Sequence, residues 1–328
     1  MILSGILSGF LSNTGTAAIF IPIIIGIAKS GGYSRSRILM PLVAAVAMGG
    51  NLTLLGSSPN IIASSQLEAA GYEEFGVFEF TPIVLPILIV GIIYYALIGY
   101  KLLPDGRNTD ANAEESVYDQ EIDYSAVPKW KTNMSIIIMV MTVIGMVFED
   151  KIGIPFFVTA WIGAIALVLS GTITQKQAFA SIDMSTLLLF VGTLSIGAAL
   201  EKTGTGSIIA QTVLGVVGDS PTAILAAILL ICIVITNFMS NTATCAFMAP
   251  IGLSIALEIG ADPRSILMSI VIGCSCAYAT PIGMPTNTMV YGIGGYKFSD
   301  YTKVGLPLII INFLVAMILL PILFPFYP

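Results

Sequence analysis

Apolar residues fill most of this chain in long segments, and polar residues interrupt them at a few defined places. Five apolar segments are long enough to predict membrane-spanning helices: residues 82–103, 134–149, 154–171, 183–201 and 304–326. A helix needs about 20 predominantly apolar residues to cross the hydrocarbon core of a bilayer. Since backbone N–H and C=O groups in lipid must bond within their own segment, we expect an all-α polytopic membrane protein.

The composition agrees with this prediction and narrows the chemistry. Hydrophobic residues make up 56% of the chain and charged residues only 10%, with a mean hydropathy of +0.95. A soluble domain carries about 25% charged residues. The chain contains no histidine, which excludes histidine metal sites, proton relays and Ser-His nucleophiles. The four cysteines lie in apolar segments and are interpreted as packing residues. We therefore expect no enzyme activity, no resident cofactor and no nucleic-acid partner.

A polar motif occurs twice inside apolar sequence. Ser-Asn-Thr occupies residues 12–14 and again residues 240–242, and each copy is followed by a Gly-x-x-x-Asn pattern at residues 56–60 and 283–287. The two distances differ by a single residue, which predicts a duplicated half. Interrupted apolar segments at corresponding positions of two halves are typical of the binding site of a secondary transporter.

The duplication suggests a division of the chain. We expect a first repeat over residues 1–103, a polar loop over 104–133 and a second repeat over 134–328. Within the second repeat, the expected parts are scaffold helices over 134–220, a hairpin over 222–259, a broken helix over 265–293 and a closing helix over 304–326. The first repeat has the same hairpin, broken helix and closing helix, but only 11 residues precede its motif. We therefore expect the chain to lack N-terminal spans, and a reduced first half is the alternative.

The motifs are expected at the tips of re-entrant hairpins. No charged residue lies between Asp219 and Glu258, and two full spans there would leave a turn of only three residues at the membrane face. A hairpin whose tip stops near the midplane fits better, because Ser, Asn and Thr side chains can bond to exposed backbone ends. The charged residues that follow, Glu258, Asp262 and Arg264, are interpreted as a solvated turn.

The basic residues predict an orientation in the cell inner (plasma) membrane. If the loop over residues 29–37 is cytoplasmic, ten of the 13 Lys and Arg residues face the cytoplasm, as the positive-inside rule requires. The loop 104–133 is then also cytoplasmic, whereas the acidic loop 68–80 and the C-terminus are extracytoplasmic. The two hairpins enter from opposite faces. We therefore expect an inverted-repeat transporter with two re-entrant helical hairpins and two broken transmembrane helices.

The residues at the tips and breaks suit small ions of both signs. Ser, Asn and Thr offer oxygen atoms to a cation and N–H or O–H groups to an anion. Helices that restart at Thr14 and Thr242 would direct their free N–H groups, with about half a positive charge, toward an anion. Breaks at Gly56 and Gly283 can expose backbone carbonyls to sodium. Because neither site carries a charged residue, anion and cations are expected to bind together, which avoids an unpaired charge in the membrane.

At these residues the chain resembles the divalent anion/sodium symporter family of the ion transporter superfamily. Both Ser-Asn-Thr motifs match its paired signature, and residues 48–60 resemble its Gly-Gly-x-x-Thr-x-x-Gly-Thr-x-Pro-Asn stretch. The resemblance implies a homodimeric elevator transporter, in which a domain that carries both hairpins slides against a fixed scaffold. It also implies Na⁺ as the coupling ion.

The resemblance implies a set of site residues in each half. The sodium ligands would be Ser8, Ser12, Asn13 and Gly56 in the first half and Thr236, Ser240, Asn241 and Gly283 in the second. The anion would contact Asn13, Thr14, Ser57, Asn241, Thr242 and Met284, where Met284 replaces a threonine of the family pattern. Supporting residues would be Pro59, Asn60, Thr280, Pro281 and Asn287.

These observations favour a sodium-coupled symporter of divalent anions, with a di- or tricarboxylate or sulfate as substrate. Three alternatives stay open. One is a sodium/proton or arsenite-type exporter of the same superfamily, which usually needs an intramembrane carboxylate. Another is a nonfunctional truncated product. The third is an intramembrane serine protease, against which the absence of histidine and of a lysine within a span counts.

Overall fold

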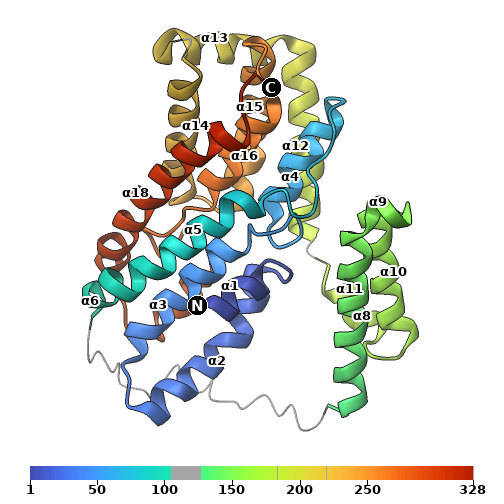
Figure 1. The fold of residues 1–328 in the computed structure, drawn as a ribbon, viewed down its shortest axis with the longest axis vertical. Coiled ribbons are helices and arrows are strands. Elements are labelled where there is room, and N and C mark those ends of the chain that lie inside the picture. Colours follow the sequence, from blue (N-terminus) through green and yellow to red (C-terminus); the bar gives the residue numbers. More distant parts are fainter. Residues whose placement is uncertain (105–126, 183, 219, 328) are drawn as a thin grey trace. The chain divides into compact units, whose positions relative to one another are not determined.

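The computed structural model describes residues 1–104, 127–182, 184–218 and 220–327 (Figure 1). The acidic part of the predicted polar loop lies outside the described residues. Every regular element among the described residues is a helix. The chain divides into two compact units, one formed by residues 1–118 together with 188–328 and the other by residues 119–187.

The N-terminal half of the first unit contains the first Ser-Asn-Thr motif. Its elements are α1 (Ile2–Ser8), α2 (Asn13–Gly31), α3 (Arg35–Gly49), α4 (Ser58–Ala69), α5 (Thr81–Tyr94), the π-helix η1 (Tyr95–Gly99) and α6 (Tyr100–Leu102). The predicted broken helix over residues 38–70 is therefore α3 and α4, with an irregular segment between them. The C-terminal half of the same unit has a corresponding order of helices from α14 onward, preceded by α12 and α13.

The elements of the C-terminal half are α12 (Met184–Thr203), α13 (Thr205–Val217), α14 (Pro221–Thr236), α15 (Asn241–Glu258), α16 (Pro263–Cys274), α17 (Pro285–Tyr291) and α18 (Phe298–Leu323), with α12 entering the unit at Leu188. Helices α14 and α15 occupy the predicted hairpin, and α16 and α17 occupy the predicted broken helix. Between α12 and α13 the chain bends by 81°. Gly204 allows this bend because its φ of +69° lies in the left-handed region.

The second unit contains α8 (Lys129–Val147), α9 (Glu149–Ile152), α10 (Phe156–Leu169) and α11 (Gln175–Ala180). Helices α8 and α10 pack against each other. Helix α8 begins five residues before the predicted span, so the polar loop that was expected to end at residue 133 ends at Pro128. The physical reason is that Lys129 and Lys131 can extend their charged ends toward water while their backbone stays helical.

Among the described residues, three helices are long and apolar enough to cross a membrane. They are Asn13–Gly31, Thr81–Leu102 and Phe298–Leu323. The bent pair formed by Leu187–Leu200 and Thr205–Val217 would be a fourth if it counts as one span. The all-helical architecture with several apolar helices is that of a polytopic membrane protein, as the sequence predicts.

The two halves of the first unit pack in the same way. Helices α1 and α2 lie against α3, and α14 and α15 lie against α16. The two halves also exchange contacts, because α4 packs on α15 and α17 packs on α2 and α3. Helices α5 and α18 run side by side (Figure 1). Helices α3 and α16 are buried along almost their whole length, from Leu39 to Gly49 and from Ser265 to Cys274, so they form the core.

Candidate functional site

Each motif serine caps the helix that follows it. Ser12 Oγ accepts a hydrogen bond from the Gly15 N–H at 3.1 Å, and Ser240 Oγ accepts one from the Ala243 N–H at 3.2 Å. A serine at the N-cap satisfies one of the free N–H groups in the first turn of a helix. The motif asparagines therefore occupy the first helical position, and the expectation that the helices restart at the motif threonines was wrong by one residue.

The last residues of α1 and α14 each carry a hydroxyl that bonds to the motif asparagine of the same half. Ser8 Oγ donates to Asn13 Oδ1 at 2.7 Å, and Thr236 Oγ1 donates to Asn241 Oδ1 at 2.9 Å. Ser8 and Thr236 are completely buried. Each bond spans a tip of four residues and holds the amide oxygen of the asparagine over the end of the preceding helix. Two equivalent groups of neutral oxygen atoms result, one in each half.

A threonine ties each irregular break to the tip of its own half. The hydroxyl of Thr53 donates to the carbonyl of Gly9, and the hydroxyl of Thr280 donates to the carbonyl of Asn237. Both threonines are at least 96% buried, with exposures of 1% and 4%. The sequence reasoning named Thr280 but missed Thr53. The signal was present, since each threonine precedes the glycine of its break by three residues.

The asparagines after the breaks hold the break backbone in place. Asn60 Nδ2 donates to the Thr53 carbonyl at 2.7 Å, and Asn287 Nδ2 donates to the Thr280 carbonyl at 3.1 Å and to the Ala277 carbonyl at 2.7 Å. Each amide thus bonds to the threonine that ties the break to its tip.

Gly56 lets the first break lie directly on the end of α1, and Gly283 lets the second break lie directly on the end of α14. A Cβ at Gly56 would be 2.6 Å from the Ser8 carbonyl oxygen, and a Cβ at Gly283 would be 2.6 Å from the Thr236 carbonyl oxygen. A real Cβ does not approach backbone atoms this closely, so only glycine fits. Hydroxyl, amide and carbonyl oxygen atoms are consequently brought together at the contact between tip and break. Hard cations prefer such oxygen ligands.

The residues just before α4 and α17 have the same backbone but different side chains. Ser57 has φ −144° and ψ 136°, and Met284 has φ −145° and ψ 135°. Both are N-caps, and neither side chain caps its helix. Ser57 and Met284 are largely buried, with exposures of 8% and 3%. The first break therefore offers a hydroxyl where the second offers a thioether.

Several buried oxygen atoms near the tips and breaks have no hydrogen-bond partner among the described residues. These atoms are Thr16 Oγ1, Asn51 Oδ1, Asn60 Oδ1 and Thr286 Oγ1. Buried polar atoms in folded proteins are nearly always paired, so unpaired ones are expected mainly where a ligand or an ordered water binds. The surroundings of the tips therefore have spare capacity for hydrogen bonds.

The residues of the two motifs differ in their exposure. Ser12, Thr14 and Ser240 are exposed, while Thr242 is half-buried and Asn241 is 8% exposed. The tips are thus accessible from one side and packed on the other. The halves also meet here, since Cys245 Sγ in α15 donates to the Pro59 carbonyl at 3.4 Å. Pro281 accepts a bond from the Thr288 hydroxyl at 2.8 Å within its own half.

Of the three charged residues expected to form a solvated turn, Glu258 ends α15 and is exposed, whereas Asp262 and Arg264 bond to neighbouring segments. Arg264 forms an ion pair with Glu79, donates to the Glu73 carbonyl at 2.8 Å and lies over the Phe75 ring. Asp262 caps α16 by accepting a bond from the Arg264 N–H at 2.9 Å. The acidic loop before α5 folds toward α16, so Arg264 finds both a carboxylate and backbone carbonyls there. No group of His, Cys, Asp and Glu suited to a metal ion occurs in the described parts of the chain.

A comparison with models of protein families shows to which family this chain is related. The family model for citrate transporters matches residues 1–155 and 143–327. This chain belongs to the citrate transporter family. The resemblance to anion/sodium symporters is thereby confirmed at the level of an anion transporter family. The chain is a transporter and not an enzyme.

Individual relatives agree with this membership. The chain is 32% identical over 247 residues to the uncharacterized transporter YfbS of Escherichia coli, a match that covers 75% of this chain and 39% of YfbS. It is 24% identical over 367 residues to the sodium-dependent dicarboxylate transporter SdcS of Staphylococcus saprophyticus, covering 99% of this chain and 68% of SdcS.

A solved structure shares the fold. MtrF of Neisseria gonorrhoeae, which is described as one of a class of antimetabolite efflux pumps, superposes with a TM-score of 0.68. The match covers 98% of this chain and 74% of MtrF at 17% identity. At this identity the likeness concerns the fold alone. It supports the fold of a polytopic membrane protein.

Proposed function

We propose that this protein is a sodium-coupled symporter of a divalent anion, with a di- or tricarboxylate or sulfate as substrate. One observation carries the proposal: the Ser8–Asn13 bond and the Thr236–Asn241 bond place equivalent neutral oxygen groups against Gly56 and Gly283. The equivalence argues for two cation sites of one kind.

The first proposed sodium site comprises Ser8, Ser12, Asn13 and Gly56, and the second comprises Thr236, Ser240, Asn241 and Gly283. Each set offers a buried hydroxyl, an amide oxygen and a backbone carbonyl within the contact between tip and break. Sodium is a hard cation and suits such ligands. The serine hydroxyls that cap α2 and α15 keep lone pairs that can contribute to the site.

The proposed anion site lies at the N-termini of α2 and α15. Their first turns carry the positive ends of the helix dipoles, which stabilise a carboxylate or another oxyanion. The contacts would come from Asn13, Thr14, Ser57, Asn241, Thr242 and Met284. These side chains are uncharged, so the bound sodium ions would supply the compensating charge. Binding of anion and cations together is the physical basis of coupled symport.

The proposed transport motion is of the elevator type, in a homodimer of inverted repeats. Both tips and both breaks belong to one compact unit, and α8 to α11 belong to the other. Such a division is what a moving domain and a fixed scaffold require. The proposed scaffold over residues 134–220 divides between the two units at Leu187. We place the loop over residues 29–37 in the cytoplasm, as the positive-inside rule favours.

The relatives support the choice of ions. SdcS is a sodium-dependent dicarboxylate transporter, and the family model describes citrate transporters. Both names refer to carboxylate substrates, and one refers to sodium. A dicarboxylate or citrate is therefore the first substrate to test, with sulfate as the inorganic dianion for comparison.

The test is uptake by the purified full chain in proteoliposomes. Radiolabelled succinate, citrate and sulfate are supplied with an inward sodium gradient or with potassium in its place. We expect sodium-dependent accumulation of at least one anion and its loss in Asn241→Ala. Equal uptake in potassium would contradict the proposal. Proton flux without anion uptake would instead favour the exporter alternative.

A further inference from the structure

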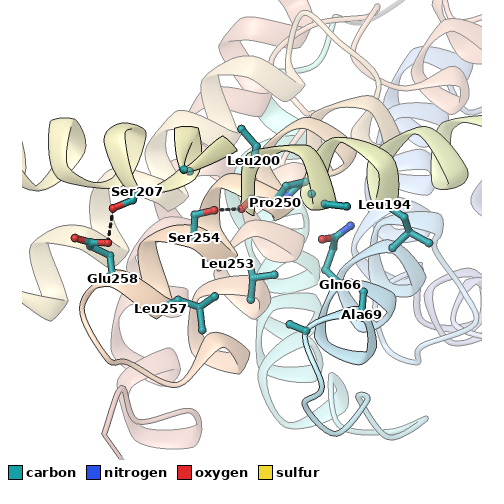
Figure 2. A pocket seen from close by; sticks show the side chains of 15 residues that line it. Gln66, Ala69, Leu194, Leu200, Ser207, Pro250, Leu253, Ser254, Leu257 and Glu258 are labelled. Atoms are coloured by element: carbon teal, nitrogen blue, oxygen red, sulfur yellow. Dashed lines mark hydrogen bonds between the residues drawn. The ribbon is translucent and has the colours of Figure 1, made fainter. Parts of the chain in front are cut away.

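A separate cavity of about 410 Å³ lies between α4, α12, α13 and α15 (Figure 2). It opens among Gln66 on α4, Leu194 on α12, Ser207 on α13 and Ser254 on α15. This cavity is distinct from the tips, because Ser254 lies thirteen residues after Asn241, about 20 Å along a helix. None of the residues assigned to sodium or anion binding lines it.

Gln66 brings an unsatisfied polar group to this cavity. Its side chain is 2% exposed, and its Nε2 has no hydrogen-bond partner among the described residues. The amide lies against α12, where a Cβ at Gly197 would be 3.0 Å from Gln66 Oε1. Glycine at position 197 thus leaves room for the amide at the cavity wall. A buried N–H donor without a partner favours a ligand that carries an acceptor.

The opposite side of the cavity favours positive charge. The last turns of α12 and α15 line it at Leu200 and Leu257, and the first turn of α13 lines it at Ser207, whose hydroxyl bonds to Glu258. The C-terminal end of a helix carries about half a negative charge. The carboxylate of Glu258 adds a full negative charge at the rim, where it accepts bonds from Ser207 Oγ at 2.7 Å and Gln211 Nε2 at 2.9 Å. No basic side chain is among the described residues that line the cavity.

Apolar side chains separate these two polar ends. Leu200, Leu253 and Leu257 line the cavity between Gln66 and Glu258, and Leu194 lines it beyond Gln66, as Figure 2 shows. The lining is therefore polar at one end, apolar along its middle and negative at the rim. Small-molecule sites commonly combine an apolar body with a few placed polar groups in a volume of this size.

We propose that this cavity binds a small organic ammonium compound with a hydrogen-bond acceptor at its far end. The ammonium group contacts Glu258 and the carbonyl ends of the helices, and the acceptor bonds to Gln66 Nε2. The apolar body of the compound packs on the leucines. Because α13 contributes Ser207 and follows the bend at Gly204, a bound compound also joins α13 to α15.

The probe is tyramine, which has an ammonium group, an aromatic body and a hydroxyl acceptor. Phenethylamine lacks the hydroxyl, and 3-(4-hydroxyphenyl)propionate replaces the ammonium with a carboxylate. Isothermal titration with the full chain in detergent should give binding of tyramine, about tenfold weaker binding of phenethylamine and no binding of the propionate. Absence of tyramine binding, or equal binding of the propionate, would overturn the proposal.

Substitutions in the cavity test the two residues that are proposed to contact the ammonium compound. Glu258→Gln and Gln66→Leu should each weaken tyramine binding at least about tenfold, whereas Thr212→Ala, on α13 but outside the cavity lining, should leave it unchanged. Glu258 is at the rim, so its variant should fold even if Gln66→Leu does not. Asn241→Ala should keep tyramine binding, which separates this site from the proposed transport site. Unchanged affinity in Glu258→Gln would refute the assignment.

Discussion

Thr236 Oγ1 donates to Asn241 Oδ1 at 2.9 Å across the tip between α14 and α15. The same hydroxyl also contacts the Cys274 carbonyl, although a hydroxyl has one hydrogen to donate. A sodium ion beside Asn241 would favour donation to Cys274, because the oxygen lone pairs of Thr236 and Asn241 would then both face the cation. The bond is thus suited to respond to sodium.

Removal of this hydroxyl should weaken sodium binding. In Thr236→Val the proposed sodium site loses one oxygen ligand, and we expect the sodium concentration for half-maximal uptake to rise about tenfold, which corresponds to about 1.4 kcal/mol. The measurement is uptake against sodium concentration at saturating anion. Thr236→Ser is the matched control and should remain near wild type. A serine variant as impaired as the valine variant would show that packing, not the hydroxyl, matters.

The motif threonine should act on the anion more than on sodium. Thr242 lies in the first turn of α15 and is half-buried, so its hydroxyl can donate to an anion at that helix end. In Thr242→Val we expect the KM for the anion to rise about tenfold at saturating sodium. The sodium concentration for half-maximal uptake should change little. Equal losses of both affinities would contradict the proposed division of roles.

Met284 should limit affinity for the anion in the second half. Its backbone matches that of Ser57, but its thioether cannot donate a hydrogen bond. Met284→Thr restores a hydroxyl, and we expect a KM several-fold lower for a dianion, since a hydrogen bond to a charged group contributes about 1.5–3 kcal/mol before packing losses. Ser57→Ala should raise KM. A higher KM in Met284→Thr would mean that its hydroxyl does not reach the anion.

A methyl group at either break should disturb the contact between tip and break. Gly283→Ala places a Cβ 2.6 Å from the Thr236 carbonyl, and overpacking of this kind costs about 1–3 kcal/mol. We expect a lower thermal unfolding temperature in detergent. Sodium should also no longer raise that temperature. Gly26→Ala in α2 is the control, because no atom lies within 4 Å of its Cβ position. A Gly283 variant as stable as the control would argue against the close contact.

The sequence by itself determined the elements and the doubled motif. Apolar segments predict the helices because helices satisfy their own backbone groups in lipid. The N-caps at Ser12 and Ser240 are equally local, since each bond joins residues three positions apart. The resemblance of the two halves followed from spacing alone. Even the missed Thr53 could be inferred from its counterpart in the second half.

Only the tertiary structure decided which distant groups meet. Thr53 bonds to a carbonyl 44 positions away, and Arg264 pairs with Glu79 across 185 positions. The cavity beside Gln66 depends on four helices that converge there. Local propensity and periodicity fix helices because their hydrogen bonds join near neighbours in the chain. Contacts between helices depend on how whole faces pack together, and the apolar pattern of α3 and α16, which are buried on all sides, does not specify their partners.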